Sequence, residues 1–214
     1  MAESIAFATT SIIVLFLLAH SPGSNSATIK LVNHSKYIVW PVIVSRQGAI
    51  SSPLAFTTGF ALQPNESIFM VVPASWSGHI WGRTLCSQDP TEKFSCVTGN
   101  CGSLSMGCVG GDLNSSATVA ELTLSNIGKL NSYRLNLAYR YNLPMKVQPL
   151  GEVSTSYMVA SCTIDLNKEC PEELKVIREG EVVACKSGCQ QVFGGSTQYN
   201  CPSSNYLITF QPTR

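Results

Sequence analysis

Short runs of β-branched and aromatic residues recur along the chain from residue 27 onward, and in several of them apolar and polar positions alternate. Alternation with a period of two is typical of strands that bury one face. Proline, glycine, serine and asparagine separate the runs, as expected of turns. Pro41, inside one run, predicts an edge strand or a bulge. The runs that we expect to form strands cover residues 28–32, 37–44, 67–72, 79–85, 118–124, 133–139 and 206–210.

This spacing of short strands, with little helical periodicity between them, predicts an all-β fold, a flattened sandwich or barrel. The best candidate for a helix is residues 171–179, PEELKVIRE, where proline lies in the first turn and acidic residues precede basic ones. Beyond about residue 150 the chain becomes more charged and loop-like. We therefore expect a β-sandwich domain at 27–150 plus 201–214 and a small disulfide-rich lobe at 151–200.

Residues 5–19 form an uncharged, mostly apolar segment of fifteen residues, which small and polar residues follow. It is shorter than the roughly 20 residues that a membrane-spanning helix needs, and it has the proportions of a secretory signal. Glu3, with no Lys or Arg in front of the segment, is atypical of such a signal. The sequence predicts a signal peptide at 1–26 and a secreted, extracellular protein.

Nine cysteines agree with an oxidising compartment, where disulfides persist. Their spacing, with two histidines after residue 26, does not fit a zinc site. We therefore expect disulfides, with no metal and no cofactor. Three sequons make their asparagines candidates for N-glycosylation. They lie at Asn33, Asn65 and Asn114.

The charge of the chain is low and balanced, with 14 Lys and Arg against 13 Asp and Glu. A nucleic-acid binder needs a basic patch that neutralises phosphates, so we expect no nucleic-acid partner. Charged residues make up 13% of the chain and hydrophobic residues 44%, which favours a packed core over disorder. The glycines near residue 110 lack the strand-to-helix context of a nucleotide-binding loop, and two histidines give little support for a catalytic triad.

Residues 94–102, FSCVTGNCG, and the following Cys108 resemble the signature of the thaumatin-like family of plant pathogenesis-related proteins, G-x-[GF]-x-C-x-T-[GA]-D-C. The chain has Glu92 and Asn100 where the signature has glycine and aspartate. Further matches cover residues 27–214, among them IWGR at 80–83 and NLPM at 142–145, which also look like those of small cereal members that inhibit xylanases. The resemblance implies a thaumatin-like flattened β-sandwich with a small disulfide-stapled lobe.

The resemblance also implies how the cysteines pair. It predicts the disulfides Cys86–Cys96, Cys101–Cys108 and Cys170–Cys185. It leaves Cys162, Cys189 and Cys201, whose family partners fall at Tyr157 or in a part of the lobe that this short form lacks. Of these we expect Cys162 to pair with Cys201, because that bond ties the lobe to the last strand. One cysteine then has no partner within the chain, so we expect a monomer whose odd thiol allows a covalent dimer.

Larger members of the family present an acidic cleft, built from an arginine, a glutamate and three aspartates, that is linked to β-1,3-glucan binding and weak glucanase activity. Glu121 occupies the position of the family glutamate. The chain has aspartate only at positions 89, 112 and 165, so the two aspartates that follow the glutamate in the family are absent. Because hydrolysis of a glycosidic bond generally needs two carboxyls, the depleted cleft predicts no catalytic residue and no enzyme activity.

The candidate ligand-binding residues are Glu121, Asp112, Arg134 and Trp76. Glu121 is a polar anchor for a sugar or a partner protein in one interpretation, and a solvated charge paired with Arg134 in the other. Asp112 either accepts a hydrogen bond from a sugar hydroxyl or shapes a turn. We expect Trp76, in a loop, to be exposed for stacking on sugars, whereas Trp40 and Trp81 are expected in the core.

The resemblance favours a secreted plant defence protein of the apoplast that is antifungal through non-catalytic binding of fungal cell-wall polysaccharide or membrane. The alternative is a protein inhibitor of a microbial glycoside hydrolase such as a xylanase, in which an exposed loop at 45–58 or 152–157 plugs the substrate groove. A weak β-1,3-glucanase is disfavoured by the missing carboxylates.

Overall fold

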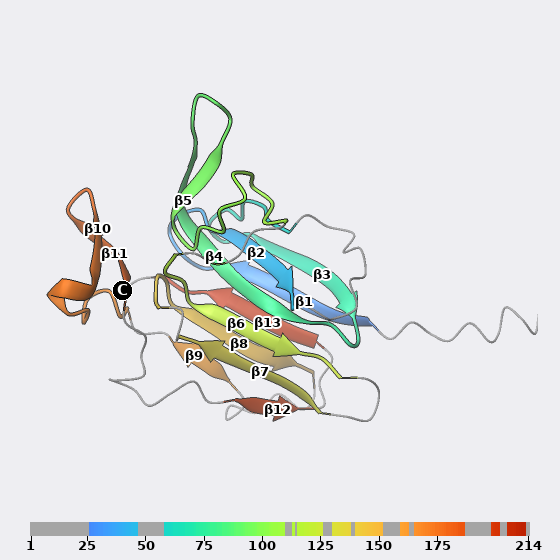
Figure 1. Cartoon of the computed structure of the whole chain (residues 1–214). Helices are drawn as coiled ribbons and strands as arrows, with labels where there is room; N and C mark the ends of the chain where they lie inside the picture. Colours follow the sequence, from blue (N-terminus) through green and yellow to red (C-terminus); the bar gives the residue numbers. More distant parts are fainter. Residues whose placement is uncertain are drawn as a thin grey trace, which may run out of the picture.

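The computed structural model is built almost entirely of strands (Figure 1). It describes residues 26–46, 58–109, 113, 115–125, 130–137, 140–151, 159–162, 165–186, 198–201 and 205–212. Residues 1–25 of the expected signal peptide lie outside the described residues, as do Asp112, Asn114, Cys189, most of the expected loop at 45–58 and all of that at 152–157. No helix in the described ranges is long and apolar enough to cross a membrane.

Five strands form the first sheet, in the order β3 (Ser67–Pro73), β1 (Ser26–Asn33), β13 (Asn205–Phe210), β8 (Met145–Leu150) and β9 (Ala160–Cys162). β1 and β13 run parallel, with Ile29 beside Tyr206 and Asn33 beside Phe210, whereas the other neighbours are antiparallel. Buried and half-buried side chains alternate along β8, as the pleat of a strand requires. The first and last strands of the described chain are therefore direct neighbours inside one sheet.

The second sheet follows the order β12 (Tyr199–Cys201), β7 (Asn131–Asn136), β6 (Val119–Thr123), β4 (Ser77–Gln88) and β2 (Trp40–Ser45). All of these pairs are antiparallel. β4 continues beyond the sheet and pairs there with β5 (Phe94–Thr98). Pro41 lies in β2 opposite Gly82, and β2 ends the strand order, so the edge position predicted for this proline is confirmed.

Both sheets bury apolar side chains in one shared core. Ile29 and Ile208 from the first sheet and Ile80 and Leu122 from the second belong to the same cluster, and each is at most 1% exposed. Full burial of such a side chain stabilises a fold by roughly 1.5–3 kcal/mol. The all-β sandwich predicted from the sequence is therefore confirmed.

The expected helix at 171–179 is wrong beyond its first turn. A 3-10 turn covers Glu172–Leu174, and the chain then enters a hairpin of β10 (Lys175–Arg178) and β11 (Glu181–Cys185) that stands to one side of the sheets in Figure 1. Glu179 and Gly180 both have positive φ, at 53° and 84°, and two such residues form the tight turn that hairpins favour. The β-branched residues of β10 also suit a strand better than a helix.

The residues of the expected lobe do not all stand apart from the sheets. β9 extends the first sheet through β8, while β10 and β11 form a two-stranded sheet of their own. A pair of backbone hydrogen bonds between Tyr141 and Cys185 fastens this hairpin to the chain between β7 and β8. The division of the chain at 150 and 200 stays a prediction.

Three predicted disulfides are confirmed. They are Cys86–Cys96, Cys101–Cys108 and Cys170–Cys185. The expected bond between Cys162 and Cys201 is wrong. Cys162 ends β9 in the first sheet, whereas Cys201 ends β12 in the second, where its Sγ lies 3.4 Å from the Tyr206 hydroxyl oxygen. The two cysteines do not pair because they lie in different sheets. The spacing of cysteines along the sequence does not show to which sheet each one belongs.

Candidate functional site

The register of three neighbouring strands places a row of polar side chains around Glu121. Glu121 on β6 lies opposite Arg134 on β7 and opposite His79 on β4. Its neighbours Ala120 and Leu122 belong to the shared core, so the Glu121 side chain points to the other face of the sheet. Residues directly opposite each other across strands are close enough to interact, and the row therefore forms a cluster of charges.

Hydrogen bonds surround both carboxylate oxygens of Glu121. Arg134 donates to Oε2 from Nε and approaches the same oxygen with Nη2, each at 2.7 Å. Asn136 donates to Oε1 from Nδ2 at 2.6 Å. His79 Nε2 lies 3.8 Å from Oε1, and Arg46 Nη2 lies 3.9 Å from Oε2. Glu121 is thus a paired carboxylate.

Glu121 is ionised in the folded protein. Its burial, which leaves it 8% exposed, raises the pKa of the carboxyl, but the hydrogen bonds from Asn136 and Arg134 and the charges of Arg134 and His79 outweigh that effect. The net result is a pKa below its ordinary value. A general acid needs a pKa near the working pH, so this carboxyl is poorly suited to protonate a leaving group.

A small cavity of about 100 Å³ opens beside the cluster. Its lining includes Arg46, Glu121, Thr123, Ser132, Arg134 and Gln198. Glu121 is the one carboxylate among the described residues that line it. Glycoside hydrolysis generally uses two carboxyls that face the scissile bond, and this lining supplies one that is already neutralised.

The pairing of Glu121 with Arg134 that we predicted is confirmed, but its solvated position on the strand face is wrong. The side chain is nearly buried because Arg134, Asn136 and Arg46 surround it. Sequence reasoning missed Arg46, His79 and Asn136. Asn136 belongs to the same predicted strand as Arg134, two positions along, and that period-two spacing was the available signal.

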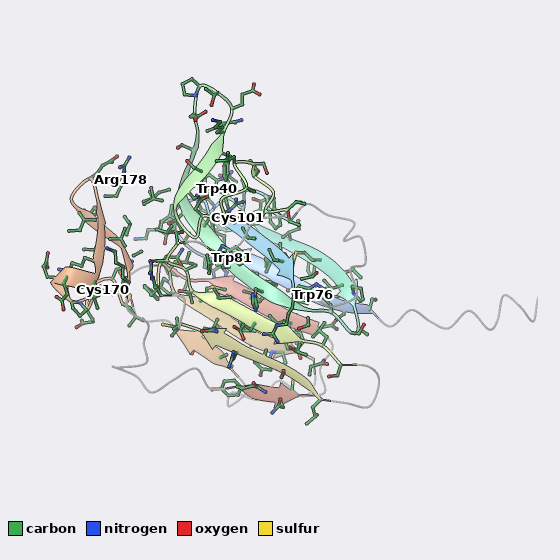
Figure 2. All side chains as sticks on the ribbon, viewed as in Figure 1. Trp40, Trp76, Trp81, Cys101, Cys170 and Arg178 are labelled. Carbon is green, nitrogen blue, oxygen red and sulfur yellow. A yellow bond between two sulfur atoms is a disulfide. The ribbon has the colours of Figure 1, made fainter. Side chains whose placement is uncertain are left out.

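Trp76 is not exposed, contrary to expectation. It is 1% exposed, and its indole N–H donates to the Ser45 hydroxyl at 3.0 Å. The turn between β3 and β4 places the Trp76 ring against Gly78. The contact requires glycine, because a Cβ atom on residue 78 would lie 2.4 Å from the ring. Figure 2 shows Trp76 at the end of these strands. Trp81 is buried as predicted, whereas Trp40 is only half-buried.

The sequons differ in how accessible their asparagines are. Asn33 is fully buried, and its Nδ2 donates to the carbonyls of Tyr37 and Leu62 at 2.9 Å each. A glycan would replace one of these two N–H donors and needs solvent access that the buried side chain does not have, so the structure argues against glycosylation at this position. Asn65 is exposed, at a turn with φ of 64°, and stays a candidate.

A second and larger cavity, of about 590 Å³, lies between the sandwich and the β10–β11 hairpin. Its lining includes Tyr37, Trp40, Leu85, Asn142, Val182 and Val183. The exposed part of this lining is mostly apolar, unlike the charged cavity at Glu121. No group of three or more His, Cys, Asp or Glu side chains that could hold a metal ion occurs within the described residues.

The ion pairs of Glu121 make the stability of the folded protein depend on pH in the acidic range. Because the folded state holds the pKa of Glu121 below its ordinary 4.5, the carboxylate contributes stability that is fully present above pH 4.5 and is lost as the pH falls through the folded-state pKa. We expect Glu121→Gln to lose less stability than the parent protein between about pH 6 and about pH 3 in urea titrations. Glu173→Gln, at an exposed site, is the matched control. Equal acid sensitivity of the parent and the Glu121 variant would contradict this role.

The fold and the site define a disulfide-stapled all-β protein in which the described lining of the polar cavity holds one carboxylate, neutralised by Arg134. The chain belongs to the thaumatin family, which residues 33–212 match. It is 39% identical to thaumatin-like protein 1 of Arabidopsis thaliana over 199 residues, which cover 89% of this chain and 74% of the relative. It is 37% identical to a Prunus avium protein named glucan endo-1,3-beta-glucosidase, over 89% of this chain and 76% of that one.

A solved structure shares the fold. The thaumatin-like xylanase inhibitor TLXI superposes with a TM-score of 0.51 at 23% identity, over 85% of this chain and 97% of that chain. The resemblance stated from the sequence is therefore confirmed at the level of family and fold. Thaumatin-like relatives and the three disulfides are consistent with an extracellular protein.

Proposed function

We propose that this chain is a secreted plant defence protein of the apoplast that binds fungal cell-wall polysaccharide without cleaving it. The observation that carries the proposal is the state of Glu121. Arg134 and Asn136 occupy its oxygens, and the described lining of its cavity contains no second carboxyl. A cavity of this kind holds polar groups but lacks the acid and base that hydrolysis requires.

The name of the Prunus avium relative makes glucanase activity the obvious competing function. That activity would need Glu121 to work with a partner carboxyl about 5 Å away, or 6.5–9.5 Å away for the inverting reaction. The opposing groups are instead the guanidinium groups of Arg134 and Arg46. Arg134 stabilises the ionised form of Glu121, and the described lining of the cavity offers no second carboxyl that could protonate a glycosidic oxygen.

Inhibition of a microbial glycoside hydrolase is the second candidate function, and the loop closed by Cys101–Cys108 favours it. Leu104 and Met106 in this loop are 53% and 42% exposed. The loop is held rigidly by the disulfide and by Arg83, whose Nη2 donates to the Met106 carbonyl at 2.6 Å. A rigid loop with apolar side chains loses little entropy when it enters a partner's groove.

One paired assay tests both functions. Purified protein is incubated with insoluble β-1,3-glucan and with isolated fungal cell walls, released reducing sugar is measured, and a panel of fungal xylanases is assayed for inhibition. We expect the protein to sediment with wall material and to release no sugar above the blank. Release of reducing sugar would overturn the non-catalytic proposal. Xylanase inhibition without sedimentation would move the protein to the inhibitor class, and Leu104→Ser should then weaken that inhibition.

A further inference from the structure

Positive charge exceeds negative charge in the cavity beside Glu121. Among the described residues of its lining, Arg46 and Arg134 contribute two positive charges and Glu121 contributes one negative charge. Arg134 directs both Nε and Nη2 at a single oxygen of Glu121, so this pair is internally neutral. One guanidinium, that of Arg46, is therefore in excess.

The Arg46 guanidinium remains available to a ligand. Its contact with Glu121, at 3.9 Å, is too long for a hydrogen bond. The Arg46 side chain is 54% exposed, in contrast to 10% for that of Glu121. Arginine presents a planar fork of N–H donors that matches the two oxygens of a carboxylate. The cavity thus offers donors to an incoming anion, while its own carboxylate is occupied.

The remaining lining indicates what carries the anion. Thr123 and Ser132 contribute hydroxyl groups and Gln198 an amide. The volume of about 100 Å³ has room for a carboxylate and the edge of one ring. A uronic acid combines these features, because its carboxylate is attached to a ring that carries hydroxyl groups on neighbouring carbons.

We propose that the cavity formed by Arg46, Glu121 and Arg134 binds the carboxylate of a uronic-acid residue in a polysaccharide. The proposal rests on the proposed function and names the sugar class that this site recognises, an acidic wall polysaccharide and not the neutral β-1,3-glucan. Arg46 makes the direct contact, and Arg134 holds Glu121 away from the ligand. Glu121 weakens binding through its charge, since like charges in one small site repel.

The test is calorimetric titration with short oligogalacturonates and with the same oligomers after methyl esterification, which removes the charge and keeps the ring. We expect binding of the ester to be about tenfold weaker, because a hydrogen bond to a charged group contributes about 1.5 kcal/mol or more. Arg46→Ala should weaken binding of the acid by about tenfold as well. Arg178→Ala removes the same charge from the distant hairpin (Figure 2) and should change nothing.

Glu121→Gln gives the sharpest result, because two interpretations of the site predict opposite signs. If the cavity binds a carboxylate, the variant should bind oligogalacturonate about fivefold more tightly, since one like charge has been removed. If Glu121 itself holds sugar hydroxyls, binding should weaken. Thermal unfolding of each variant confirms that it is folded before its affinity is compared.

Several outcomes would overturn the proposal. Equal affinity for the acid and the ester, equal losses in the Arg46 and Arg178 variants, or weaker binding by Glu121→Gln would each do so. If the protein still sediments with fungal walls in those cases, the proposed function stands and the uronate site alone is wrong. Absence of binding to walls and to oligogalacturonate would reject both. The protein could also inhibit a xylanase tightly in a way that requires Arg46, and not bind oligogalacturonate. The ligand of the cavity would then be a carboxylate side chain of the xylanase, and the uronate proposal would be wrong.

Discussion

Replacing Arg83 with alanine should lower the free energy of unfolding by about 4 kcal/mol. Arg83 is completely buried in β4, donates to the carbonyls of Trp40 and Met106, and lies 4.9 Å from the ring centre of Phe94. Alanine would remove the donors of two partly buried carbonyls and leave a cavity in place of the fully buried Arg83 side chain. Equilibrium unfolding in urea measures the loss.

Arg83 is a charged side chain in a fully buried position. Burial lowers its pKa to about 10, so it is still protonated at neutral pH, and no carboxylate among the described residues forms an ion pair with it. Carbonyl groups and an aromatic face therefore stabilise the cation. The conservative variant Arg83→Lys should recover part of the loss, and Arg178→Ala should be within about 0.5 kcal/mol of the parent. A loss below about 1 kcal/mol for Arg83→Ala would contradict this account.

Replacing Asn142 with alanine should destabilise the protein by about 3 kcal/mol. Its Oδ1 accepts from the backbone N–H groups of Thr118 and Leu143, and its Nδ2 donates to the Gly82 carbonyl and the Thr98 hydroxyl. Four segments of the chain thus meet at one buried amide that is 3% exposed. Alanine would leave these buried groups unpaired, which costs more than the net value of the bonds themselves.

One further variant separates the hydrogen bonds of Asn142 from its packing, and a second is an exposed control. Asn142→Asp keeps the acceptor oxygen and loses the donors, so it should also be strongly destabilising. Asn200→Ala, at an exposed position of β12, should change stability by less than about 0.5 kcal/mol. Urea titrations of the three variants make the comparison, and stability of Asn142→Ala equal to that of the Asn200 control would contradict the network.

The sequence predicts features of this fold that repeat along the chain. Period-two runs predict strands such as β1, β4 and β13, because the alternation is a local property of a strand that buries one face. The short strands β9 and β12 carry only three residues each and show no such pattern. The expected helix at 171–179 overlaps the first strand of the hairpin at 175–185, because acidic residues precede basic ones there as in a helix, whereas Glu179 and Gly180 form the turn of a hairpin.

The sequence predicts a residue of the candidate site only if that residue matches a position of the family's cleft or lies in the same strand as one that was already identified. Glu121 and Arg134 were identified, whereas Arg46 and His79 enter through the antiparallel register of β2, β4 and β6. Register depends on how separate strands pair, and a single sequence carries little information about it. Trp76 was misplaced for a related reason. A loop position suggested exposure, but packing against Gly78 and the bond to Ser45 turned the ring inward.

The parallel pairing of β1 with β13 has a consequence for biosynthesis. β13 is an inner strand of its sheet, with β1 on one side and β8 on the other. A growing chain therefore cannot complete the first sheet until β13 has left the ribosome, because the strand partner of Ile29 is Tyr206, 177 positions further along the chain. During that interval β1 and β8 present unpaired edges, which favour contact with other chains. The first sheet is thus expected to close only after β13 has emerged, and the disulfides within 86–108, which close early and locally, can form before β1 and β13 pair.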